Sequence, residues 1–152
     1  MINTRLLRKG FVLATGVLLC GGALADNCSG RYTNVGVSSE TVEVAKGHTV
    51  TFFVSRGSTV SDNSPYNAVG ECGGYFLTTP DGKTMAAGIC TRKGKDEDSE
   101  SDVFALEPGA ERGTWKLVAG TGAFAGMKAS GWWQPMVDDG KENMGKWGGN
   151  CR

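Results

Sequence analysis

Short runs in which apolar and polar residues alternate cover most of the chain beyond its first 26 residues. The clearest run is His48 to Arg56 (HTVTFFVSR), which is rich in β-branched and aromatic residues, and Ser101 to Glu107 (SDVFALE) alternates in the same way. Because successive side chains of a strand point to opposite faces, this period predicts strands. The same pattern predicts further strands at 32–37, 41–45, 75–77, 85–89 and 143–147.

The segments between these strands are rich in glycine, proline and small polar residues. We expect Ser38 to Glu40 to connect two strands, Gly57 to Gly70 to form a loop, and Arg92 to Glu100 (RKGKDEDSE) to form a charged loop. No segment carries a sustained helical repeat. Glycines within strands suit the sharp bends of a small barrel, and closing a barrel removes exposed strand edges. We therefore predict an all-β fold, a small closed or nearly closed antiparallel barrel of about eight strands.

One stretch, Arg112 to Gln134 (RGTWKLVAGTGAFAGMKASGWWQ), predicts two strands joined by a glycine-rich turn. In the second strand the adjacent Trp132 and Trp133 point to opposite faces, so one lies in the core or lumen and the other lies outside. An exposed tryptophan on a barrel wall indicates a contact with a ligand or a partner. The candidate ligand or partner contacts are Trp132, Trp133, Trp147 and Tyr75.

Within this stretch, Gly113-Thr114-Trp115, the turn Gly120 to Gly126 (GTGAFAG) and Gly131 resemble the allene oxide cyclase and dirigent barrel group. The resemblance covers about 20 residues, from Gly113 to Gly131. It implies an eight-stranded antiparallel barrel with an apolar lumen. It also implies binding or cyclisation of hydrophobic small molecules, sometimes by oligomers. The glycine-rich turn has a structural role in that group, so the resemblance is better evidence for the fold of this chain than for its activity. No catalytic residue is carried over to this chain.

The first 25 residues have the features of a secretory signal peptide. Arg5, Arg8 and Lys9 precede an apolar core, Phe11 to Leu19, and Ala23-Leu24-Ala25 fits the small-x-small cleavage pattern. The apolar core is shorter than a membrane span, which needs about 20 residues. We therefore expect a signal peptide over residues 1–25 and a single β-barrel domain over 26–152, either periplasmic or secreted further.

Four cysteines follow the cleavage site, and an even number in an oxidising compartment predicts two disulfides. Their number alone leaves three pairings open. The segment Thr79 to Lys83 (TPDGK) fits a type I turn with a glycine bulge. If Thr79 faces Lys83, Cys72 faces Cys90 at a non-hydrogen-bonded position, where side chains approach most closely. A bulge at the neighbouring glycines would change this register. The remaining pair, which then joins the two ends of the barrel, is Cys28 and Cys151.

Charge and composition argue against several function classes. Without the signal peptide the chain has 13 basic and 16 acidic residues, a net charge of −3, and no basic run longer than two residues. We therefore expect no nucleic-acid partner. His48 is the only histidine and no Gly-x-Ser-x-Gly elbow is present, so we assign no catalytic residue, metal ligand or cofactor. The acidic run Asp96 to Asp102 lacks the spacing of a calcium loop, and we interpret it as solvated.

These observations favour an exported, non-enzymatic binding module that holds a hydrophobic or aromatic small molecule in its lumen or docks on a partner protein. The first alternative is a cyclase-like or isomerase-like enzyme acting on a hydrophobic substrate. A lumen that buries an ionisable group beside aromatic rings would favour that alternative. The second alternative is an envelope interaction or inhibitor protein that acts through its outer surface. A homo-oligomer is a separate expectation that is compatible with each of these functions. A lumen filled by side chains would leave only this second alternative.

Overall fold

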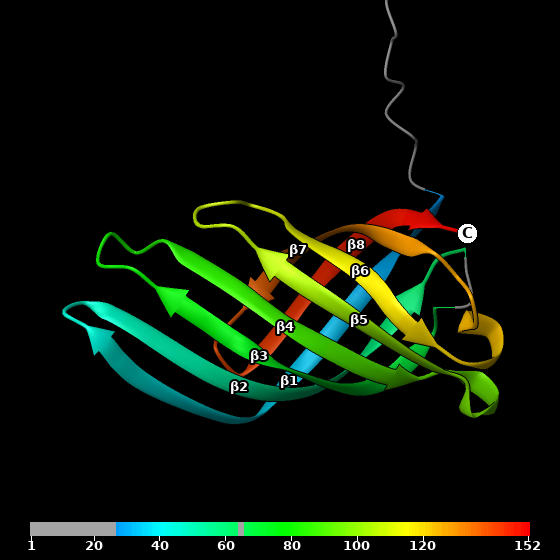
Figure 1. The fold of residues 1–152 in the computed structure, drawn as a ribbon, viewed down its shortest axis with the longest axis horizontal. Coiled ribbons are helices and arrows are strands. Elements are labelled where there is room, and N and C mark those ends of the chain that lie inside the picture. The colour runs from blue at the N-terminus through cyan, green and yellow to red at the C-terminus, as the bar shows by residue number, and fades with distance from the viewer. Residues whose placement is uncertain (1–26, 64–65) are drawn as a thin grey trace, which may run out of the picture.

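The computed structural model of the chain describes residues 27–63 and 66–152. The described residues form eight strands, which close into one antiparallel barrel in which neighbours in sequence pair and the last strand pairs with the first (Figure 1). The strands are β1 (Cys28–Ala45), β2 (His48–Ser61), β3 (Ala68–Thr78), β4 (Thr84–Lys93), β5 (Ser99–Leu106), β6 (Gly113–Gly120), β7 (Ala129–Asp138) and β8 (Glu142–Cys151). The predicted all-β barrel is confirmed, and the predicted signal peptide lies outside the described residues.

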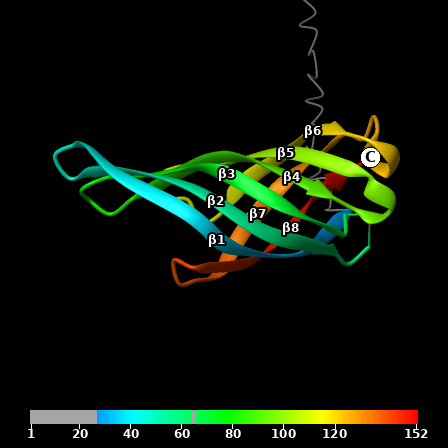
Figure 2. The same ribbon diagram turned by 90° about the horizontal axis from the view of Figure 1, so that it is seen from below.

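Two short 3-10 turns complete the chain, η1 (Lys95–Glu97) between β4 and β5, and η2 (Gly122–Phe124) between β6 and β7. The turns that follow β1, β3 and β5 lie at one end of the barrel (Figures 1 and 2). The two 3-10 turns and the C-terminus lie at the other end. No helix within the described residues has the length and apolar character that a membrane crossing requires.

Two of the expected connections are wrong. Ser38 to Glu40 do not separate two strands, because β1 runs through them and stays paired with β2. The register shifts between Gly36 and Ser38, so a bulge absorbs one residue without ending the strand. The expected loop at 57–70 is also shorter than predicted, since β2 continues to Ser61 and β3 begins at Ala68.

The β3–β4 hairpin has the predicted turn. Gly82 donates its N–H to the Thr79 carbonyl at 2.9 Å and has a φ of +78°, and Thr79 donates to the Lys83 carbonyl at 2.9 Å. This is a type I turn closed by a glycine bulge. Pairing then continues without a register shift to Cys72 and Cys90, whose Cα atoms are 4.0 Å apart and whose sulfurs are bonded.

The second disulfide joins Cys28 at the start of β1 to Cys151 at the end of β8. Both predicted pairings are therefore confirmed. The two bonds are consistent with folding in an oxidising compartment, and so with export.

A cluster of side chains fills the barrel at the end where the Cys28–Cys151 disulfide lies. Tyr66, from the β2–β3 connection, and Phe124, from η2, are 3% and 1% exposed, and their ring centroids are 5.3 Å apart. Trp147 on β8 packs against Tyr66 at 5.8 Å and against Trp115 on β6 at 5.8 Å. The phenylalanine of the GTGAFAG turn is therefore part of an aromatic plug that closes this end of the barrel.

Candidate functional site: the barrel lumen

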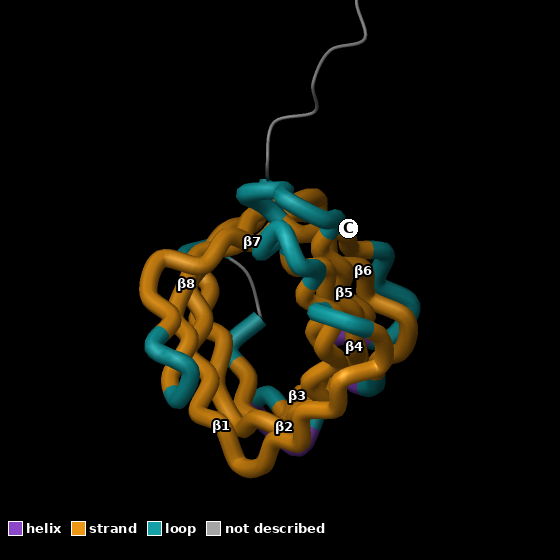
Figure 3. Tube along the Cα trace, turned by 90° about the vertical axis from the view of Figure 1, so that its left-hand side faces the viewer, coloured by secondary structure: helices purple, strands orange, loops and turns teal. Residues whose placement is uncertain are grey.

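Above the aromatic plug the barrel is hollow. A cavity of about 930 Å³, open to solvent, is lined by residues from all eight strands, by the β7–β8 turn and by Tyr66 from the plug. Figure 3 views the barrel from the hairpin-tip end and shows the strands arranged in a ring. The lumen is hollow and is not filled by side chains. A function inside the barrel therefore stays open beside the outer-surface alternative.

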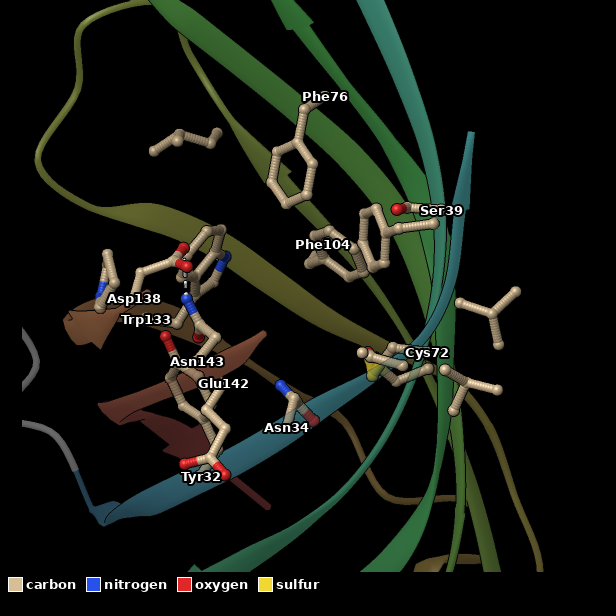
Figure 4. A pocket seen from close by; sticks show the side chains of 18 of the residues that line it. Tyr32, Asn34, Ser39, Cys72, Phe76, Phe104, Trp133, Asp138, Glu142 and Asn143 are labelled. Atoms are coloured by element: carbon tan, nitrogen blue, oxygen red, sulfur yellow. Dashed lines mark hydrogen bonds between the residues drawn. A yellow bond between two sulfur atoms is a disulfide. The ribbon is translucent and has the colours of Figure 1, made fainter. Parts of the chain in front are cut away.

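Five aromatic rings form a continuous arc along the lumen wall. Phe53 on β2 stacks on Phe76 on β3 with centroids 4.7 Å apart, and it lies 6.4 Å from Phe104 on β5. Phe104 meets the edge of Trp133 on β7 at 6.2 Å, and Trp133 in turn lies 6.5 Å from Tyr32 on β1. Figure 4 shows Phe76, Phe104, Trp133 and Tyr32 around the same space. The arc offers a flat aromatic or alicyclic ligand several faces to stack on.

Glycines on neighbouring strands make room for these rings. Gly88 is the register partner of Phe104, and a Cβ at Gly88 would lie 2.4 Å from the phenyl ring. Gly145 is the partner of Tyr32, and a Cβ there would lie 2.5 Å from the phenol ring. The barrel therefore pairs a large residue with glycine across adjacent strands, which explains why so many glycines occur within strands.

A buried charged cluster lies deeper in the lumen. Glu100 and Asp102 on β5 are 3% and 6% exposed, and Arg92 on β4 is the direct register partner of Glu100. The Arg92 Nη1 donates to Glu100 Oε1 at 3.3 Å and also to Asp102 Oδ2, while its Nη2 lies 3.5 Å from Cys72 Sγ. One guanidinium thus serves two carboxylates beside a disulfide.

This cluster corrects the interpretation of the acidic run as solvated. Asp96 and Glu97 are exposed as expected, but Glu100 and Asp102 point into the lumen. The reason is that β5 begins at Ser99 and places both carboxylates on the same face as Phe104. Asp102 lies two residues before Phe104, so both side chains point to the same face of a strand. This spacing was the sequence signal that could have placed the carboxylates in the lumen.

Burial changes the acidity of the cluster. It raises the pKa of Glu100 to about 7, with Arg92 opposing the rise and Asp102 adding to it. Burial also raises the pKa of Asp102, again against the effect of Arg92. The pKa of the Tyr66 hydroxyl is raised by burial and then by the charges of Glu100 and Asp102. Glu100 is therefore a carboxyl that exchanges a proton near neutral pH inside an aromatic cavity.

Polar residues line the mouth of the cavity at the β7–β8 turn. Asn143 Nδ2 donates to Asp138 Oδ2 at 2.9 Å, and Lys141 and Glu142 lie beside them (Figure 4 labels Asp138, Asn143 and Glu142). The pKa of Tyr32 is raised by burial and then by Asp138. The mouth is thus hydrophilic, whereas the middle of the lumen is aromatic.

The structure divides the four predicted contact residues between the two sides of the barrel wall. Trp133 and Trp147 both line the lumen. Trp132 faces outward, where the Arg112 guanidinium carbon lies 4.5 Å from the centroid of its indole. Tyr75 pairs with the outward-facing Phe52 and is not among the lining residues.

The only histidine lies away from the lumen. The Nδ1 of His48 is 3.2 Å from the Lys46 carbonyl oxygen, at the β1–β2 turn. Among the described residues, no three His, Cys, Asp or Glu side chains are grouped so that they could hold a metal ion.

Fold and lumen together define an eight-stranded antiparallel barrel with a deep internal pocket. Among solved structures, the chain is similar to the pterocarpan synthase dirigent protein GePTS1, with a TM-score of 0.51, 13% identity, and coverage of 93% of this chain and 96% of that chain. The pterocarpan synthase dirigent protein PsPTS1 aligns with a TM-score of 0.48 and 13% identity over 81% of this chain and 91% of that chain. No protein-family model and no curated protein matches the chain.

The first of these similarities establishes that the barrel is dirigent-like in fold. The resemblance read from Gly113 to Gly131 is therefore confirmed at the level of architecture. Function has to be argued from the lumen itself, because one fold hosts many activities.

Proposed function

We propose that this protein is an exported binding protein that holds a hydrophobic or aromatic small molecule in the barrel lumen. The cavity of about 930 Å³ carries the proposal, because it lies within the size range of ligand pockets, about 300–1,000 Å³. Its lining combines aromatic rings with hydrogen-bonding and charged side chains, and small-molecule pockets likewise join apolar walls to polar groups that fix the ligand's orientation. An apolar molecule that enters displaces water from the rings of Phe53, Phe104 and Trp133.

Native mass spectrometry of protein purified without reduction tests this proposal. We expect an extra mass that leaves on denaturation, and its size identifies the ligand. A Thr51→Trp variant places an indole at a lining position, whereas Phe52→Trp places the same side chain at the adjacent outward position, which is 54% exposed. The bound mass should disappear in the first variant and persist in the second. Retention in both variants would contradict binding in the lumen.

A second candidate function is supported by Glu100. A general acid or base works best when its pKa lies near the working pH, and burial brings this carboxyl to about 7 beside aromatic rings. The lumen is therefore equipped for a cyclisation or isomerisation in which Glu100 takes a proton from one atom of a hydrophobic substrate and returns it to another.

The molecule recovered from a Glu100→Gln variant separates the two candidates. An enzyme would accumulate substrate in the variant and product in the wild-type protein. The two recovered molecules are isomers of equal mass, so they would differ in chromatographic retention time. A binding protein would yield the same molecule from both forms. The Glu71→Gln variant changes an outward carboxylate, 54% exposed and paired with Arg56, and serves as the control.

A further inference from the structure

The residues that line the cavity carry more negative than positive charge. Four carboxylates face it, and only Arg92 and Lys141 carry positive charge among its lining residues. The acidic residues come from two depths, with Glu100 and Asp102 near the aromatic plug and Asp138 and Glu142 at the mouth. A solute that enters the lumen therefore passes carboxylates at both levels, which attract cations and disfavour anions.

The inner pair of carboxylates shares a single counter-charge. Arg92 Nη1 reaches both carboxylates and its Nη2 is directed at a disulfide sulfur, so when both acids are ionised the cluster has one uncompensated negative charge. An uncompensated buried charge is unfavourable unless a proton or a counter-ion neutralises it. In the empty lumen a proton on Glu100 can do so, and a ligand cation would do the same in its place.

The aromatic walls are suited to hold such a cation. Phe53, Phe104 and Trp133 present rings to the lumen, and Tyr66 and Trp147 lie beneath it. Ring faces attract ammonium groups, and the attraction grows when the site is shielded from water. Among the described residues the recorded cation–π pair, Arg112 with Trp132, lies on the outer wall.

Two polar atoms along the same lumen lack hydrogen-bond partners in the described structure. They are the Tyr32 hydroxyl and the Nε1 of Trp147, and Trp147 is 7% exposed. Both residues lie on the β1–β8 wall, two register positions apart, since Gly145 pairs with Tyr32 and Gly30 pairs with Trp147. Buried donors of this kind are seldom left unsatisfied, and a ligand oxygen that accepts a hydrogen from either group would supply the missing partner.

We propose that the lumen selects hydrophobic cations, molecules in which an amine or ammonium group is joined to aromatic or alicyclic rings. The ammonium group lies at Glu100 and Asp102, and the rings stack along the arc from Phe53 to Trp133. An oxygen acceptor on the ligand meets the wall formed by Tyr32 and Trp147. This inference rests on the proposed binding function and specifies the class of ligand.

Three matched probes test the inference: diphenylpropylamine, diphenylpropanol and diphenylpropanoic acid, which share their rings and differ in end-group charge. Binding is measured by tryptophan fluorescence and by calorimetry. At about pH 8, where Glu100 is ionised, we expect the amine to bind at least about tenfold more tightly than the alcohol, and the acid to bind most weakly. At about pH 5.5 the advantage of the amine should shrink to within about threefold, because Glu100 is protonated there.

The Glu100→Gln variant should lose the preference for the amine at about pH 8, so that it binds the amine and the alcohol within about threefold of each other. Asp102→Asn should lower the preference in the same direction, and it is the second test if the first variant does not fold. The outward Glu71→Gln control should behave as wild type. The pH dependence of amine binding also reflects the groups that face Glu100, which are Arg92, Asp102 and Tyr66.

The outcomes separate this inference from the function on which it rests. If the alcohol binds in the lumen and the amine binds no more tightly, the binding function stands and the cation preference is wrong. A preference for the amine that survives both Glu100→Gln and Asp102→Asn would also overturn it. If none of the three probes binds, the proposed binding function fails together with the inference.

Discussion

Trp133 on β7 lies directly over Gly113, its register partner on β6, and its indole occupies the space that a side chain at residue 113 would need. A Cβ at Gly113 would lie 2.2 Å from the Cε2 of Trp133. The indole is also held by its Nε1, which donates to the Thr114 carbonyl at 3.1 Å. β6 and β7 share four paired positions in the described barrel, and the indole of Trp133 adds a side-chain contact to this short ladder.

Replacing Gly113 by valine should therefore destabilise the barrel. The new side chain forces Trp133 out of its position or separates the two strands, and overpacking of this kind costs about 1–3 kcal/mol. Urea unfolding followed by far-UV circular dichroism measures the loss. Thr114→Val, one residue away and pointing outward, should change the free energy of unfolding by less than about 0.5 kcal/mol. Equal stability of the two variants would contradict this account of the seam.

The two disulfides should contribute unequally to stability. Cys28–Cys151 spans 123 residues and Cys72–Cys90 spans 18, so in the chain-entropy model they contribute about 5 and about 3 kcal/mol. Paired serine substitutions, one pair at a time, should lower the urea midpoint more for the first bond than for the second. A larger loss for the hairpin disulfide would show that its contacts in the folded lumen, including Arg92, matter more than loop closure.

The stability of the protein should fall as the pH rises toward 7 and above. The pKa of Glu100 is about 7 in the folded state against about 4.5 when unfolded, so the folded state holds the extra proton between these values. The contribution of Glu100 to stability, up to about 3 kcal/mol, is therefore fully present below about pH 4.5 and is lost as pH rises through 7. The raised pKa of Asp102 contributes with the same sign, and Arg92 opposes both effects.

Urea unfolding of wild type and Glu100→Gln at about pH 5 and about pH 8 checks this prediction. The variant should show a smaller pH dependence, and at the higher pH it should be at least as stable as wild type because no charge is buried at residue 100. A wild-type protein that becomes more stable over this interval would contradict the placement of Glu100.

The two adjacent tryptophans should report on different sides of the wall. Trp132→Phe should leave the fluorescence change caused by diphenylpropanol intact, because Trp132 lies outside beside Arg112. Trp133→Phe should reduce that change, because Trp133 lines the lumen beside Phe104. Quenching by acrylamide in the absence of ligand gives the complementary test, since it should decrease more for Trp132→Phe. Identical responses of the two variants would contradict the assignment of faces.

The local geometry of the turns and strands could be predicted from the sequence. The type I turn at Thr79 to Lys83 fixes which residues of β3 and β4 face each other, so the pairing of Cys72 with Cys90 follows from counting along two strands. The period of a strand likewise required Trp132 and Trp133 to point to opposite faces. The glycine-rich GTGAFAG turn indicated the architecture, although its phenylalanine proved to be part of the plug.

Which strand faces line the lumen, and whether the lumen is hollow, depends on how the whole barrel closes. A charged run beside a turn is usually solvated, and the alternation of Glu100 and Asp102 with Phe104 does not by itself show that Glu100 is buried while Glu97 is exposed. The β4–β5 hairpin places Arg92 opposite Glu100, and closure of the barrel buries the carboxylates of Glu100 and Asp102 in its interior. Arg92 then makes the two buried carboxylates tolerable. The hollow interior has the same origin. Its volume depends on how eight strands close around aromatic rings and glycines that are far apart in the chain. No short stretch of sequence contains all of these residues, so the volume cannot be predicted from local patterns.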